Sequence, residues 1–127
     1  MNKDEALIDL CKTLLEDPEI VEQQGWQKLI LIGEVNDGDR GMHGYSYDLD
    51  GKCLLISPTP RNLQKLKVMH DVMKADNASG RGWLKCMIRI SRNGEVGADF
   101  EYNDAKRWSH TPENYKDRIK EYAAMPV

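Results

Sequence analysis

The chain has 127 residues, of which 40% are hydrophobic and 31% charged, a composition that suits one soluble globular domain and argues against intrinsic disorder. Lysine and arginine number 18 against 21 aspartates and glutamates, so the formal charge of −3 argues against a nucleic-acid-binding protein, which needs a basic surface. No apolar run approaches the roughly 20 residues of a membrane-spanning helix, and we expect no membrane partner.

The N-terminal segment predicts an amphipathic helix. Asn2 is a suitable N-cap, Glu5 completes a capping box, and apolar residues follow at helical spacing. Asp17-Pro18 is expected to break this helix or restart it for a further turn, and Gly25 to end it. The segment lacks a signal-peptide core, and the three cysteines are widely spaced and suit buried free thiols, so we expect a cytoplasmic protein.

Strands follow the first helix. Residues 26–35 are rich in branched aliphatic side chains and predict one strand. Residues 42–57 predict two more, joined around Asp50-Gly51, which is a strong hairpin signal. The stretch "NDGDRG" at 36–41 is expected to be a polar loop between them.

The remaining elements are a helix, two strands and a last helix. Thr59-Pro60 supplies an N-cap and a first-turn proline for a helix over about 60–76, and Thr111-Pro112 repeats this signature for the last one. The strands between them are expected at 83–91 and 95–102. The order α-β-β-β-α-β-β-α with short turns predicts a single α+β domain over 1–127, an antiparallel sheet of about five strands with helices packed on it.

The turn before the last strand decides which side chains share a face. A two-residue Asn93-Gly94 turn would place the apolar sides of the two strands on opposite faces, whereas a three-residue loop with Gly94 in the left-handed conformation brings them together. The second register therefore predicts that Asp99 and Glu101 lie on a solvated face. The basic neighbours expected there are Lys85 and Arg89.

The candidates for acid–base or metal chemistry are His43, His70 and His110. His70 lies on the apolar side of the second predicted helix beside Asp71, where we expect a hydrogen-bonded structural histidine. No histidine or cysteine pair has the spacing of a zinc site, the "NDGDRG" loop lacks key ligands of a calcium loop, and no nucleophile elbow occurs. We predict no catalytic residue, no cofactor and no metal ion.

The segment "GWLKCMIRISRNGEVGADFEYND", with "YSYDLDGK" before it and "W…TPENY" after it, resembles the YezG-type antitoxin family of small bacterial immunity proteins. Members of that family bind and neutralise the toxic C-terminal domain of a polymorphic or contact-delivered toxin, often a nuclease. The resemblance implies a cytoplasmic binding protein whose partner is the cognate toxin domain. It implies no catalytic residue.

A nuclease binds polyanions through a basic cleft, so an acidic inhibitor can associate with it by electrostatic steering. The carboxylates expected to contact the toxin lie around the two hairpins: Asp37, Asp39, Asp48, Asp50, Asp99, Glu101 and Asp104. Two other functions stay open at this point. One is a chaperone or adaptor for a secreted effector, and the other is a small hydrolase assembled from His70, Asp71, His43 and distant acids.

Overall fold

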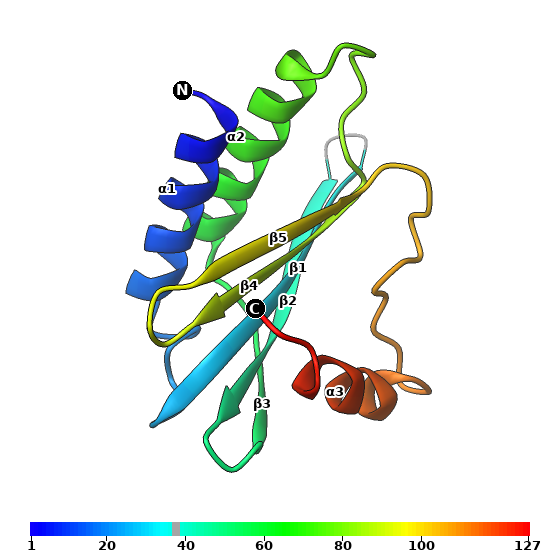
Figure 1. The fold of residues 1–127 in the computed structure, drawn as a ribbon. Helices are drawn as coiled ribbons and strands as arrows, with labels where there is room; N and C mark the ends of the chain where they lie inside the picture. The colour runs from blue at the N-terminus through cyan, green and yellow to red at the C-terminus, as the bar shows by residue number, and fades with distance from the viewer. Residues whose placement is uncertain (37–38) are drawn as a thin grey trace.

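The computed structural model describes residues 1–36 and 39–127, and this part of the chain forms the predicted α+β domain with its elements in the predicted order (Figure 1). The helices are α1 (Lys3–Glu16), α2 (Pro60–Asp76) and α3 (Tyr115–Ala123). The strands are β1 (Trp26–Asn36), β2 (Asp39–Asp48), β3 (Cys53–Ile56), β4 (Lys85–Ser91) and β5 (Val96–Glu101). Among the described residues, none of these helices combines the length and apolar character that crossing a membrane requires.

The strands form one antiparallel sheet with the order β3-β2-β1-β4-β5. Strand β1 is therefore central, and β3 and β5 are the two edges. The four side chains from Leu29 to Ile32 alternate between the two faces, yet each is at most 2% exposed. The aliphatic run in β1 follows from this position, because a strand covered on both faces needs apolar residues at every position.

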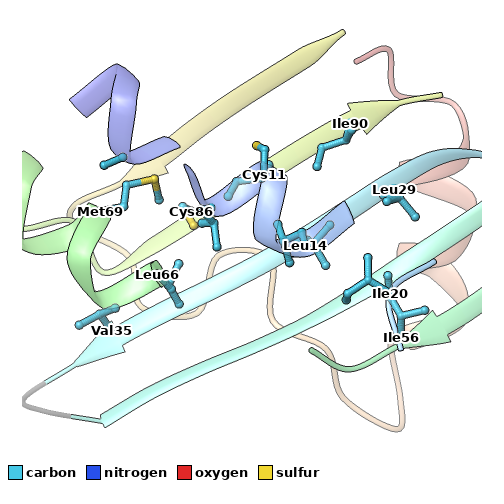
Figure 2. Close-up of a cluster of buried hydrophobic side chains, with 14 of the residues drawn as sticks. Cys11, Leu14, Ile20, Leu29, Val35, Ile56, Leu66, Met69, Cys86 and Ile90 are labelled. Carbon is cyan, nitrogen blue, oxygen red and sulfur yellow. The ribbon is translucent and has the colours of Figure 1, made fainter. Parts of the chain in front are cut away.

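Helices α1 and α2 lie side by side on one face of the sheet (Figure 1). Figure 2 shows how Leu14, Leu66 and Met69 from these helices pack on side chains of the sheet, and all three are fully buried. Gly33 in β1 permits this close approach: a Cβ atom there would lie 2.8 Å from Cδ1 of Leu66. The main hydrophobic core therefore lies between the helix pair and the sheet.

The opposite face carries a second hydrophobic cluster under α3, formed by Ile30, Ile32, Tyr45, Tyr47, Met87, Trp108 and Tyr122. The sequence predicted a solvated face for Asp99 and Glu101, and this expectation is only half right. The Asp99 side chain is 59% exposed, whereas that of Glu101 is 13% exposed. The reason is that residues after β5 turn back across this face before α3 begins.

Helix α3 is fixed to the sheet by hydrogen bonds from side chains to its main chain. The Lys28 Nζ atom donates to the carbonyl oxygens of Tyr122, Ala123 and Met125 at 2.7, 2.9 and 2.7 Å. The Tyr47 hydroxyl donates to the carbonyl oxygen of Ile119 at 2.8 Å. An ammonium group at the C-terminus of a helix satisfies its unpaired carbonyls and complements its dipole.

A buried carboxylate joins the end of α1 to the start of α2. Asp17 is the C-cap of α1 and is 5% exposed. Its Oδ1 atom accepts the N–H of Glu19 at 2.9 Å, and its Oδ2 atom accepts both the N–H and the hydroxyl of Thr59 at 3.0 Å. Oδ2 also accepts from Nδ2 of Asn62, which is fully buried. Thr59 is the predicted N-cap, but its hydroxyl binds Asp17 and not the helix main chain.

Two predicted boundaries are wrong. Residues 39–41 belong to β2 and pair with the end of β1, so they are not part of the expected polar loop. Helix α3 begins at Tyr115 with Asn114 as N-cap, and not at Thr111-Pro112. Thr111 instead closes a turn with Asn114, because the N–H of each residue donates to the side-chain oxygen of the other, at 2.8 and 3.2 Å.

The predicted β4–β5 register is confirmed. Ile88 is opposite Ala98 and Lys85 is opposite Glu101, and Gly94 has the left-handed φ of 93° that the three-residue loop requires.

Cysteine burial follows the prediction in part. Cys11 and Cys86 are buried, Cys53 is half-buried, and within the described residues all three are free thiols.

Candidate functional site

The structure distributes the predicted acidic residues over separate places. Asp39 and Asp48 lie at opposite ends of β2, about 30 Å apart at 3.3 Å per residue. Asp99 and Glu101 lie on β5, at the sheet edge opposite to β3. Asp37 lies outside the described residues. The described members of the predicted set are therefore spread over both ends of β2 and the β5 edge and form no single cluster.

The β2–β3 turn combines acidic and apolar side chains on a rigid frame. Oδ1 of Asp48 accepts the N–H groups of Asp50 and Lys52 at 3.0 and 2.8 Å, and the Asp48 N–H donates to the carbonyl oxygen of Lys52 at 3.0 Å. Gln23, which precedes β1 in the chain, also binds the turn: its Nε2 atom donates to the same Lys52 oxygen at 3.0 Å. Asp48 is thus a structural part of the turn, while Asp50 is exposed.

Large apolar side chains are exposed beside these carboxylates. Leu49, between the two aspartates, is 84% exposed, and Leu54 and Leu55 on β3 are 36% and 47% exposed. Leu54 and Leu55 are adjacent in an edge strand and so point to opposite faces, which places apolar surface on both sides of the edge. We call Asp48, Leu49, Asp50, Leu54 and Leu55 the hairpin patch.

The acids on the other edge are largely neutralised within the chain. Oδ2 of Asp99 lies 2.7 Å from Nη1 of Arg89. Oε1 of Glu101 accepts from Nη1 of Arg107 at 2.9 Å, and Oε2 accepts the N–H groups of Asn103 and Asp104. The bond from Arg107, with these two N–H groups, lowers the pKa of Glu101 to about 2. Glu101 therefore fixes the chain as it leaves β5, and its basic partner is Arg107 instead of the predicted Lys85.

Lys85 on β4 lies opposite Glu101 on β5 and opposite Glu34 on β1. Glu34 was not among the predicted site residues. The Lys85 Nζ atom lies 3.6 Å from Oε2 of Glu34 and donates to Oγ of Ser109 at 3.2 Å. The side chain of Lys85 is 7% exposed and that of Glu34 is 58% exposed. A single acid near the end of an otherwise aliphatic strand was the available signal for Glu34.

The structure brings two of the three histidines together on the α3 side of the sheet. The rings of His43 and His110 lie 5.1 Å apart, and Nδ1 of His110 is 2.6 Å from the Tyr45 hydroxyl. Burial, followed by the nearby charges of His110 and Lys85, lowers the pKa of His43 to about 4. His43 is therefore neutral at physiological pH, as suits a packed aromatic group.

His70 lies on the opposite face of the sheet from His43. Its ring packs edge-on against Trp83 with 4.9 Å between centroids, and its Nδ1 atom is 3.4 Å from Oδ1 of Asp71. Its side chain is 12% exposed, as expected for a structural histidine. The sheet thus separates His70 and Asp71 from His43, so these residues form no common site.

Within residues 1–36 and 39–127, no group of three or more histidine, cysteine, aspartate or glutamate side chains has the geometry to hold a metal ion. No family model and no curated protein matches the chain. Its function is therefore inferred from the geometry of its own residues.

Proposed function

We propose that this chain is a cytoplasmic immunity protein that binds the toxic C-terminal domain of a polymorphic or contact-delivered bacterial toxin and neutralises it. The observation that carries the proposal is the hairpin patch. Exposed leucines next to carboxylates, on a hairpin whose turn is internally hydrogen-bonded, suit the binding of another protein.

The composition of the patch resembles that of a protein interface. A stable interface has an apolar centre that is desolvated on binding, surrounded by a polar rim. Leu49 and Leu55 are the candidates for the apolar centre, and Asp48 and Asp50 for the rim. The turn is held by main-chain and side-chain hydrogen bonds before any partner arrives, so little conformational entropy is lost on binding.

The charge of the patch favours a basic partner. The hydrogen bonds that hold the turn use the carboxylate of Asp48, whereas Asp50 takes part through its main-chain N–H and is exposed. A nuclease has a basic surface because its substrate is a polyanion. Together with the net charge of −3, Asp50 would speed the encounter with such a surface by electrostatic steering.

The proposal is tested by co-expressing the chain with the toxin domain encoded by the gene immediately upstream. We expect growth to be restored and a stoichiometric complex to be recovered. A complex that leaves the toxin fully active would indicate a chaperone or adaptor instead. Absence of both rescue and complex would contradict the pairing.

The contact surface is tested by two substitutions in the hairpin patch. Leu49→Ala is expected to weaken toxin binding about tenfold or more, as for a residue at the centre of an interface. Asp50→Lys is expected to slow association and to reduce its dependence on salt. The matched controls are Val68→Ala, at a position 43% exposed on α2, and Asp76→Lys at the end of α2. Equal effects of the patch and control variants would place the contact elsewhere.

A further inference from the structure

Strand β5 is an open edge whose alternate main-chain groups point away from the sheet. The carbonyl oxygens of Glu95 and Glu101 accept hydrogen bonds from the β4 side, from the N–H groups of Ser91 and Leu84 at 2.9 and 2.7 Å. In an antiparallel ladder the direction alternates, so the N–H and C=O groups of Val96, Ala98 and Phe100 point outward. No other strand among the described residues pairs with them.

An apolar groove lies between α1 and the start of β5. It has a volume of about 430 Å³ and is lined by Leu7, Ile8, Cys11, Leu15 and Val96 together with charged residues of α1. Ile8, Leu15 and Val96 are 54%, 40% and 46% exposed. Ile8 and Leu15 are seven residues apart, which places them on one stripe of α1 that faces the edge and not the core.

The other face of the same edge carries a cation whose donors are incompletely used. Arg89 binds Asp99 of its own chain through Nη1, and its Nε atom is buried with no hydrogen-bond partner among the described residues. Its Nη2 atom lies over Gly97, where a Cβ atom would be only 2.7 Å away. The carbonyl carbon of Val127 lies 3.2 Å from the same point. Because Gly97 has no side chain, the guanidinium reaches toward the open edge.

We propose that a second copy of this chain pairs antiparallel with the β5 edge, about a two-fold axis at Ala98. The two sheets then form one continuous sheet. In this register the two residue numbers of every pair add up to the same value. Val96 therefore lies opposite Phe100 of the second copy, and Gly97 lies opposite Asp99 of the second copy. This interface is independent of the proposed toxin contact, because the hairpin patch is at the other edge.

The register makes the edge complementary to itself. On the α1 side, Val96 meets the ring of Phe100 of the second copy, since the paired strands are about 4.8 Å apart. On the other side, Asp99 of the second copy lies beside Gly97, over which Nη2 of Arg89 extends. A carboxylate beside it would accept a charge-assisted hydrogen bond from Nη2, the terminal nitrogen that does not bind Asp99 of the same chain.

The same register has one pair of like charges, and the structure supplies its counter-charge. Glu95 lies opposite Glu101 of the second copy. Arg107 already binds the Glu101 carboxylate, and its own side chain is 52% exposed. Its positive charge therefore offsets the negative charge of Glu101 in each such pair. The apolar and the charged halves of the edge thus favour a second copy of the chain over an unrelated segment.

The first test is the oligomeric state of the isolated chain, measured by light scattering and sedimentation over a range of concentrations. We expect a dimer with twice the mass of one chain. Val96→Lys should raise the dissociation constant about tenfold or more, because it places a charge opposite Phe100 on an edge strand. Val68→Lys is the matched control, since Val68 is 43% exposed on α2 and far from the edge, and it should leave the dimer unchanged.

The second test fixes the register by oxidative cross-linking. In the proposed pair the two Ala98 Cα atoms are about 5.5 Å apart, within the range that a disulfide spans, so Ala98→Cys should form a covalent dimer. The two Val96 Cα atoms are displaced by four residues, about 13 Å, so Val96→Cys should not cross-link with its mate.

Three results would overturn the proposal: a monomer at every concentration, a dimer that Val96→Lys weakens no more than Val68→Lys does, or cross-linking of Val96→Cys in preference to Ala98→Cys. A monomer whose toxin binding is lost in Val96→Lys would assign the β5 edge to an extended segment of the toxin instead.

Discussion

Replacing Asp17 with alanine is expected to lower the free energy of unfolding by about 3 kcal/mol. The carboxylate is 5% exposed and receives hydrogen bonds from the main chain and hydroxyl of Thr59 and from Asn62. A hydrogen bond to a charged group contributes about 1.5–3 kcal/mol, and a buried donor left unpaired costs about 1–3 kcal/mol. The N–H of Thr59 and the amide of Asn62 would lose their partner, while the lower desolvation of alanine offsets part of the loss.

The matched control is Asn77→Ala. Asn77 is the C-cap of α2 as Asp17 is of α1, and its Oδ1 atom likewise accepts the N–H of the residue two positions on, that of Ser79, at 3.0 Å. It lacks the buried bonds to a second helix, so its loss is expected to cost about 1 kcal/mol or less.

Urea denaturation of the wild type and both variants measures the difference. Because 3 kcal/mol is large for a domain of this size, the midpoint of thermal unfolding should fall by roughly 10 °C in Asp17→Ala. If Asp17→Ala and Asn77→Ala agree within about 1 kcal/mol, water replaces the carboxylate and the junction is not a major source of stability.

Two further changes probe the face under α3. Acidification should lower the free energy of unfolding by up to about 3 kcal/mol between pH 6.5 and 4, because the pKa of His43 falls from 6.5 to about 4 on folding and the unfolded chain binds the proton first. This loss of stability should be absent in His43→Leu. The lowered pKa of Glu101 causes a separate loss of stability between pH 4.5 and about 2. Lys28→Met should cost about 2 kcal/mol and speed hydrogen exchange in α3, because three carbonyl oxygens lose their donor.

The controls for these two changes come from the same chain. Lys116→Met removes an exposed ammonium from α3 itself and should change neither stability nor exchange appreciably. An acid transition that His43→Leu leaves unaltered would show that another group controls it. Equal rates of hydrogen exchange in α3 of Lys28→Met and of the wild type would mean that the hydrophobic cluster alone holds the helix.

The elements that sequence reasoning identified are those whose signals are local. Asn2 and Glu5 form the predicted capping box at the start of α1, and Gly94 determines the β4–β5 register within a few residues of the strands that it aligns. The order of the strands and the attachment of α3 depend on residues far apart in the chain. Lys28 contacts a carbonyl oxygen 94 residues later, a pairing that no periodicity reveals.

The candidate site was predicted less well for a related reason. Charge counts selected Asp48 and Glu101 as partner contacts, but the structure uses both carboxylates to hold main-chain N–H groups. Leu49 and Val96 were not selected, although they are 84% and 46% exposed. Their significance depends on which edges of the sheet are open, and that is known only once the strand order is known.

The central place of β1 has a consequence for synthesis of the chain on the ribosome. One side of β1 pairs with β2, the next strand in the chain, but Lys28 pairs with Ser91 and Glu34 with Lys85, so its other side has no partner until β4 is made. At about 5–20 residues per second, that interval lasts several seconds. During it the aliphatic run "LILI" of the nascent chain has an unpaired strand edge, the kind of segment on which chains aggregate. Glu34 places a charge at the end of this run, where it hinders such pairing until β4 has been made.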